Sequence, residues 1–188
     1  MTDKPNTVDL TEEMAKMITS DDINRYLHKG GDEILKYSEL SRYENINELL
    51  PSNGTYKIIL IETNYNVGHW CCILRYGKTI EWFDSYGIVP DGELKFVSAI
   101  KKKLLGEDHK YLTNLLASAT KQGFHVIYNK KKLQKVKNGV NTCGRWVLLR
   151  ITMMKDMLYD LPEFLAFVKK SLEGGELSRD ELITQWVK

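Results

Sequence analysis

Three residues could together activate a thiol for chemistry: His69, Asp84 and Cys143. Such chemistry needs a cysteine held as a thiolate, a histidine that exchanges protons with it, and a carboxylate that orients the imidazole ring. A histidine alone is more often a hydrogen-bonded or surface residue, and a free cysteine is commonly buried in a core. It is therefore the set of three, and not any one member, that predicts a nucleophilic site.

The segment that carries His69 and Asp84 is predicted to be a β-hairpin. Residues 68–76 and 79–84 are rich in β-branched and aromatic side chains, and a short turn containing glycine separates them. His69 lies at the start of the first strand and Asp84 at the end of the second. Both residues are therefore expected at the same end of the hairpin, where Asp84 can accept a hydrogen bond from the imidazole ring.

Cys143 is predicted to begin a helix. It follows the turn-rich residues 137–142 and opens an apolar stretch that continues to about residue 159. The free N–H groups and the dipole of a helix start favour a thiolate and can also face a developing oxyanion. Gly144 follows, and its lack of a side chain would let a substrate backbone approach.

The remaining pattern predicts an α+β chain in which helices flank a central block of strands. The expected strands span 56–61, 68–76, 79–84 and 124–128. Four of the expected helices cover 10–18, 91–105, 112–119 and 143–159. Three further helices are expected: one capped by Ser20, one with Pro162 in its first turn, and a last one opened by a capping box at Ser178. Residues 32–50 are expected to form short helical turns.

Length and composition favour one ordinary globular domain. We expect it to cover residues 1–188, with a helical N-terminal part at 1–50, a catalytic core at 55–160 and C-terminal helices at 161–188. The chain is 43% hydrophobic and 28% charged, with a formal net charge of +2, so charge alone demands neither a nucleic acid nor a membrane as partner. We expect a monomer.

The cysteines and the apolar pattern indicate a compartment. Three cysteines are too few, and odd in number, for a disulfide framework, which favours a reducing intracellular location. The sequence has no run of 18 apolar residues and no apolar signal core at its start. Cys71 and Cys72 are adjacent on a predicted strand and point to opposite faces, so we expect core packing for both and no metal.

Three short motifs carry a resemblance to a known clan of cysteine peptidases. They are Gly68-His69-Trp70, Phe83-Asp84-Ser85-Tyr86-Gly87 and Thr142-Cys143-Gly144. Together they resemble the motif series of the adenovirus maturation proteases and the ubiquitin-like-protein-specific proteases. The resemblance covers about residues 58–151 and implies a papain-like fold with the catalytic order His, Asp, Cys. It also implies that Trp70 lines a narrow groove beside the scissile bond, whereas the residue type alone fits packing in the core equally well.

The same motifs look most similar to those of proteases from virophages, Polinton-type elements and large DNA viruses. The resemblance therefore implies an endopeptidase that cuts capsid or other virion precursors, in the host cytoplasm (the virus factory) and in the virion. A deconjugating protease for ubiquitin-like modifiers would share every catalytic residue and remains an alternative. A catalytically silent module that binds peptide or nucleic acid is a second one.

The oxyanion donor departs from the clan pattern. Relatives usually place a glutamine six or seven positions before the cysteine, and neither position holds one here. A loop insertion would let Gln134, nine positions before the cysteine, take that role. Asn138 or Asn141 would otherwise supply the amide.

No cofactor is expected, although the resemblance leaves room for an activating peptide or DNA. Lys101–Lys103 and Lys130–Lys132 are clusters of the kind that usually form solvated faces. They could also give weak DNA binding, which would depend steeply on salt.

Overall fold

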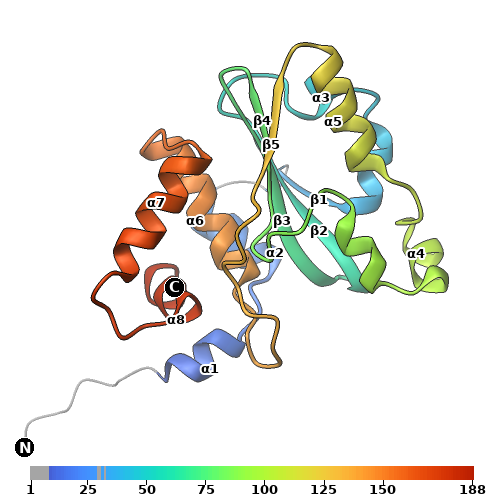
Figure 1. The fold of residues 1–188 in the computed structure, drawn as a ribbon. Helices are drawn as coiled ribbons and strands as arrows, with labels where there is room; N and C mark the ends of the chain where they lie inside the picture. The colour runs from blue at the N-terminus through green and yellow to red at the C-terminus, as the bar shows by residue number, and fades with distance from the viewer. Residues whose placement is uncertain (1–8, 29–30, 32) are drawn as a thin grey trace, which may run out of the picture.

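A mixed five-stranded sheet lies between two groups of helices (Figure 1). The computed structural model describes residues 9–28, 31 and 33–188. Helices α6, α7 and α8 lie on one side of the sheet and α3, α4 and α5 on the other (Figure 1). The expected α+β class, with a central mixed sheet flanked by helices, is confirmed.

The sheet has the order β1-β2-β3-β4-β5. Its strands are β1 (Ile34–Lys36), β2 (Tyr56–Asn64), β3 (Val67–Tyr76), β4 (Thr79–Phe83) and β5 (His125–Tyr128). The central pairs β2–β3 and β3–β4 are antiparallel, whereas the outer strands β1 and β5 run parallel to their neighbours. The four predicted strands are present, and the predicted hairpin is β3 with β4.

The helices partly differ from those expected. They are α1 (Leu10–Ala15), α2 (Ser20–Leu27), α3 (Ile46–Leu49), α4 (Ala99–Leu105), α5 (Tyr111–Lys121), α6 (Cys143–Asp156), α7 (Leu161–Leu172) and α8 (Arg179–Trp186), with 3-10 turns η1 (Tyr37–Arg42) and η2 (Gly92–Phe96). Pro162 lies in the first turn of α7, and Ser178 forms the capping box of α8, as predicted. Among the described residues, no helix is long and apolar enough to cross a membrane.

Three predictions about local structure were wrong. The expected helix at 91–105 is divided into η2 and α4, because the Ser98 hydroxyl accepts a hydrogen bond from the Lys101 N–H and starts a new helix. The cap of α2 is Thr19 and not Ser20: the Thr19 side chain accepts from the Asp22 N–H in a capping box. The stretch 32–50, of which residue 32 lies outside the described residues, contains strand β1 as well as helical turns.

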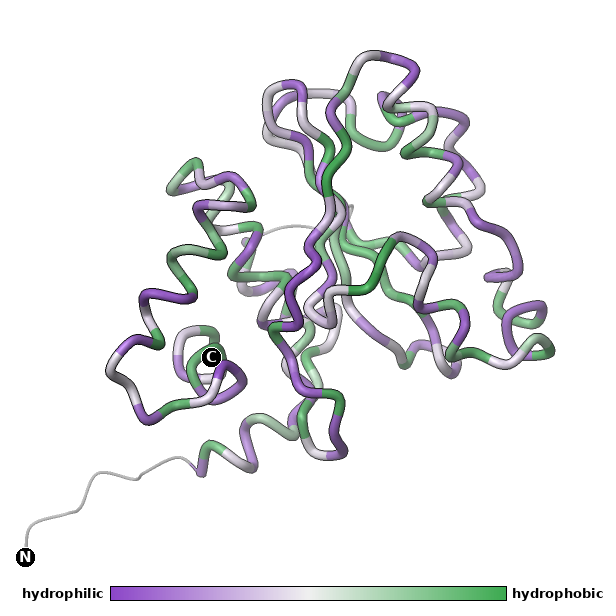
Figure 2. The backbone as a smooth tube through the Cα atoms, in the orientation of Figure 1, coloured by the Kyte–Doolittle hydropathy of each residue, from purple (hydrophilic) through white to green (hydrophobic). Residues whose placement is uncertain are grey.

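The two faces of the sheet bury two separate sets of apolar side chains. Cys72 packs on the face that α6 covers, whereas Cys71 packs on the opposite face, beside residues of α3 and α5. Both cysteines are completely buried, so the prediction that they point to opposite faces of a strand is confirmed. Figure 2 shows green, hydrophobic segments along the central strands and alternating green and purple along the outer helices.

A buried ion pair fixes α6 against the sheet. Arg150 Nε lies 2.8 Å from Glu81 Oε1, and its Nη2 lies 2.6 Å from Glu81 Oε2. Both side chains are inaccessible to solvent. Because Glu81 belongs to β4 and Arg150 to α6, this pair sets the position of the helix that begins with Cys143.

Candidate functional site

The β3–β4 hairpin brings His69 and Asp84 into contact. His69 Nε2 lies 2.8 Å from Asp84 Oδ1, and both side chains are buried. The register pairs Cys72, in the middle of β3, with Phe83 at the end of β4, so Asp84 follows directly beside the half of β3 that carries His69. The turn between the strands thus makes neighbours of two residues that are 15 positions apart.

The loop after β4 holds the Asp84 carboxylate in place. Asp84 Oδ1 accepts a hydrogen bond from the Tyr86 N–H at 2.8 Å, and Oδ2 accepts one from the Ile88 N–H at 3.0 Å. The Tyr86 ring stacks on the His69 ring, with 4.3 Å between the centroids. The carboxylate and the imidazole are therefore both fixed before any substrate binds.

Cys143 is the first residue of α6 and lies within hydrogen-bonding reach of His69. Burial alone would raise the pKa of the Cys143 thiol. The charge and hydrogen bond of His69, together with the N–H groups of Trp70 and Gly144, outweigh burial and lower this pKa. The structure therefore favours a thiolate at the start of α6.

His69 is shifted in the complementary direction. Burial disfavours a charged imidazolium, but the acidic groups around the ring, Cys71, Glu93, Cys143 and Asp84, outweigh it and raise the pKa of His69. A raised histidine pKa beside a lowered cysteine pKa favours a thiolate–imidazolium pair.

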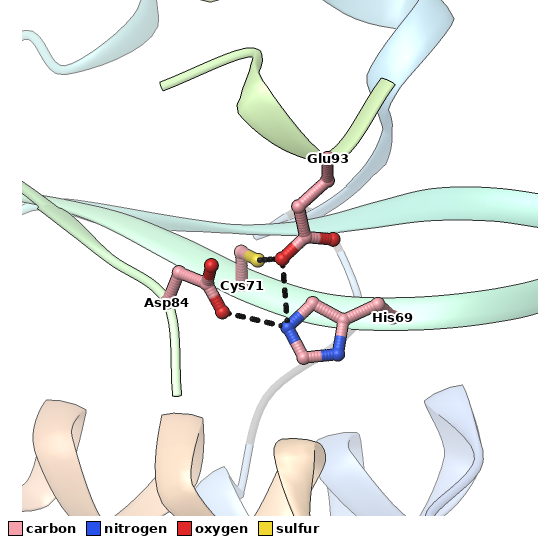
Figure 3. Close-up of side chains that lie close together, drawn as sticks. All are labelled: His69, Cys71, Asp84 and Glu93. Carbon is pink, nitrogen blue, oxygen red and sulfur yellow. Dashed lines mark hydrogen bonds and ion pairs between the residues drawn. The ribbon is translucent and has the colours of Figure 1, made fainter. Parts of the chain in front are cut away.

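Glu93 belongs to the site, although the sequence did not indicate it. In Figure 3 its carboxyl group points from η2 toward the same ring nitrogen that Asp84 contacts, with Glu93 Oε1 at 3.2 Å from His69 Nε2. Burial, followed by the nearby Asp84 carboxylate, raises the pKa of Glu93 to about 9 even though His69 lowers it. The Glu93 carboxyl group therefore holds its proton to a higher pH than an ordinary glutamate does.

Four of these side chains have donor atoms that suit a metal ion. Single donor atoms of His69, Cys71, Asp84 and Glu93 all lie within 4.8 Å of one another. One nitrogen, one sulfur and two oxygens form a set that zinc accepts. The separations of 2.8 Å and 3.2 Å from His69 Nε2 to the two carboxyl groups are hydrogen-bond distances, so the side chains as placed form a hydrogen-bonded network.

Gln134 is buried between the two parts of the site. Its Oε1 accepts a hydrogen bond from the Ser85 hydroxyl at 2.9 Å, and its Nε2 donates to the Val140 carbonyl at 3.1 Å. It thus connects the residue after Asp84 with the loop that leads to Cys143. The second N–H of its amide leaves Gln134 able to donate once more.

The two asparagines considered as substitutes are placed differently. Asn141 donates through Nδ2 to the Ala15 carbonyl at 2.6 Å, so its amide contacts the last residue of α1. Asn138 is exposed. Of the three amides, Gln134 is the buried one that contacts a residue adjacent to Asp84.

Cys143 opens onto a cleft of about 530 Å³. The cleft is also lined by Ile18, Gly68 and Trp70. Trp70 packs in the core and donates through Nε1 to the Ile18 carbonyl at 2.9 Å. A methyl group at Gly144 would lie 3.0 Å from Ile18 Cβ, so the glycine gives close packing at the wall of this cleft.

Comparison with known proteins identifies a viral relative. No protein-family model matches the chain. The chain is similar to "Uncharacterized protein V9" of Sputnik virophage, with 36% identity over 153 residues, which are 81% of this chain and 83% of the relative. The chain belongs to the family of this virophage protein. Its membership of the V9 family supports a virophage origin.

None of the six lysines in the two clusters of this V9-family chain lines the cleft. Lys101–Lys103 belong to α4, where Lys101 Nζ donates to the Thr63 carbonyl and to Asn64 Oδ1. Lys130–Lys132 follow β5 and are exposed. Both positions fit solvated faces, and DNA binding there stays a prediction.

Proposed function

We propose that the chain is a cysteine endopeptidase with a papain-like arrangement of its catalytic residues. The observation that carries the proposal is the arrangement of the site: Cys143 begins a helix, His69 lies within its hydrogen-bonding reach, and Asp84 contacts Nε2 of the same imidazole ring. This is the geometry of an activated nucleophile with an oriented base. The intact set also argues against a silent binding module, which has no need of a thiolate.

In the proposed mechanism, the Cys143 thiolate attacks the substrate carbonyl carbon and forms a tetrahedral intermediate. The His69 nitrogen that faces away from Asp84 then protonates the leaving amine, and the carbon–nitrogen bond breaks (Figure 3). Water attacks the resulting thioester while it gives a proton to His69. The carbon–sulfur bond then breaks, which releases the acid product and restores the Cys143 thiolate beside the His69 imidazolium. Asp84 keeps the ring oriented through both steps.

The oxyanion would be stabilised at the start of α6. The N–H of Cys143 is one donor, because the first amides of a helix have no partner within that helix. The Gln134 side chain is the proposed second donor, since its amide is buried, anchored to Ser85 and Val140, and has one N–H to spare. Trp70 would contact the substrate where it lines the cleft. Gly144, proposed as a substrate-binding position, would act by letting Ile18 and Trp70 pack closely at that wall.

For the substrate, we propose a capsid or other virion precursor, cut in the infected host cell or in the assembling particle. Support comes from the virophage relative and from a cleft that opens at Cys143. An extended segment of a precursor is the kind of ligand that such an open cleft admits.

The direct test is to express candidate virion precursors with the wild-type chain or with Cys143→Ala and to identify new termini by mass spectrometry. Cys72→Ala is the matched control, because it removes a buried cysteine that packs among apolar side chains. We expect cleavage with the wild type and the control, and none with Cys143→Ala. Cleavage that persists in Cys143→Ala would refute the proposal, and cleavage confined to a ubiquitin-like conjugate would change the substrate class.

A further inference from the structure

The loop between β4 and α4 is built to hold one side chain, Glu93, against the candidate catalytic histidine. Two residues before Glu93, Asp91 adopts a left-handed backbone conformation, with φ of 60°. The Asp91 carboxylate accepts hydrogen bonds from Tyr37 Oη at 2.6 Å and from the Thr113 N–H at 2.8 Å. A methyl group at Gly92 would lie 2.6 Å from Ile88 Cγ2, closer than real contacts allow. The hydrogen bonds of Asp91 and the close packing of Gly92 against Ile88 therefore both restrict the backbone that carries Glu93.

Glu93 points at an atom that already has a partner. Its Oε1 lies 3.2 Å from His69 Nε2, and Asp84 Oδ1 lies 2.8 Å from the same nitrogen. One ring N–H cannot fully satisfy two carboxylates, and two buried carboxylates side by side repel each other. A proton on Glu93 removes this repulsion and allows Glu93 to donate a hydrogen bond to Asp84, with which it is in contact.

We infer that Glu93 is a positioning residue: as a neutral carboxylic acid it donates a hydrogen bond to Asp84 and so fixes the Asp84–His69 pair relative to Cys143. The inference rests on the proposed function, because it concerns the same histidine. The raised pKa of Glu93 supports it, since the side chain stays protonated in the neutral range.

A neutral partner also suits the chemistry better than a second charge. The titratable groups that face Glu93 are His69 and Cys71 from β3, Asp84 from the end of β4 and Cys143 from α6. A further full negative charge here would stabilise the imidazolium and would hinder the return of its proton to the leaving amine. A neutral donor orients Asp84 without this cost.

The test compares three variants. Glu93→Gln keeps a neutral hydrogen-bond donor of nearly the same shape, and Glu93→Leu removes the donor. Glu107→Leu is the matched control, because Glu107 is also a completely buried glutamate, hydrogen-bonded to the Glu62 N–H. The readouts are kcat and KM for a cleaved precursor peptide, and the rate at which iodoacetamide alkylates Cys143, which needs no substrate.

We expect Glu93→Gln to keep kcat and the alkylation rate within about 3-fold of wild type, and Glu93→Leu to lower both by about 10- to 100-fold at nearly constant KM. Glu107→Leu should leave both rates unchanged while it lowers the melting temperature. If Glu93→Leu does not fold, Glu93→Met takes its place, because it also lacks a hydrogen-bond donor and keeps a side chain of similar length.

Three results would overturn the inference. In the first, Glu93→Gln loses as much activity as Glu93→Leu, which would mean that a charged carboxylate is required. In the second, Glu93→Leu matches wild type. In the third, the purified wild type contains one zinc ion per chain that Glu93→Gln lacks, which would make Glu93 a ligand. Failure of the proposed function is distinct, because Cys143→Ala would then still cleave or wild-type Cys143 would react no faster than a free thiol.

Discussion

Glu81 and Glu93 are two buried glutamates whose side chains lie on opposite faces of the sheet. Glu81 faces α6, where the guanidinium of Arg150 contacts both of its oxygens, and the Tyr76 hydroxyl donates to it at 2.7 Å. Glu93 lies by Cys71 on the other face, and its nearest basic group is a ring nitrogen that also contacts Asp84. The residue type and the burial are the same, and the partners differ.

The difference separates a structural carboxylate from a functional carboxyl group. A planar guanidinium compensates Glu81 through two hydrogen bonds, which makes the Glu81–Arg150 pair a fixed joint between β4 and α6. Glu93 has no guanidinium partner, and its raised pKa favours a protonated carboxyl group. It lies near Cys143, whose thiol has a lowered pKa. Perturbed groups of this kind gather where chemistry takes place.

Breaking the structural pair should give the largest loss of stability. Arg150→Met leaves Glu81 buried without its cation, and we expect the free energy of unfolding to fall by about 3–5 kcal/mol. Urea denaturation measures this change. The double variant Glu81→Leu, Arg150→Met should regain most of the loss, and a double variant as unstable as the single one would show that the pair itself is needed.

Breaking the catalytic pair should lower the rate much more than the stability. Asp84→Asn keeps the shape of the side chain but removes the charge that orients and stabilises the imidazolium, so we expect kcat to fall by about 10²-fold or more. Steady-state kinetics on a precursor peptide, with thermal melting in parallel, separate the two effects. A kcat that stays within a factor of two would contradict the role given to Asp84.

The proton on Glu93 predicts a pH dependence of stability. The pKa of Glu93 is about 9 in the folded chain against an ordinary value of 4.5, so its contribution to stability is complete below pH 4.5 and is lost as the pH rises toward 9. The melting temperature of wild type should therefore fall between pH 6 and pH 9 relative to Glu93→Gln. Parallel curves for the two proteins would show that Glu93 does not hold a proton.

The smallest effect should come from a contact that involves neither glutamate. Trp70→Phe removes the hydrogen bond from Nε1 to the Ile18 carbonyl and keeps most of the apolar packing. We expect a loss of about 1 kcal/mol in stability and a higher KM, because Ile18 and Trp70 both line the cleft. A fall in kcat with KM unchanged would show that Trp70 contributes to the catalytic step and not to substrate binding in the cleft.

The sequence could predict what depends on neighbours along the chain. The β3–β4 hairpin follows from two apolar runs around a glycine turn, and the start of α6 follows from a polar loop before an apolar stretch. These two features placed His69, Asp84 and Cys143 on the elements that bring them together.

What the sequence missed depends on contacts between distant segments. Strand β1 has three residues and forms because it pairs with β2. Glu93 falls inside the helix expected over 91–105, whereas the structure places it in the 3-10 turn η2, two residues after Asp91, which Tyr37 and Thr113 anchor. Nothing in the local pattern around residue 93 signals that arrangement.

The central claim, that Cys143 is a thiolate paired with His69, is tested most directly by the pH dependence of its alkylation. Cys71 and Cys72 are completely buried, so labelling with iodoacetamide, followed by mass spectrometry, reports on Cys143. We predict that Cys143 reacts at pH 6.5 at least about 10-fold faster than a free thiol, whose pKa is about 8.5, and that His69→Ala abolishes the difference. A wild-type rate that follows the free thiol over the whole pH range would contradict the claim.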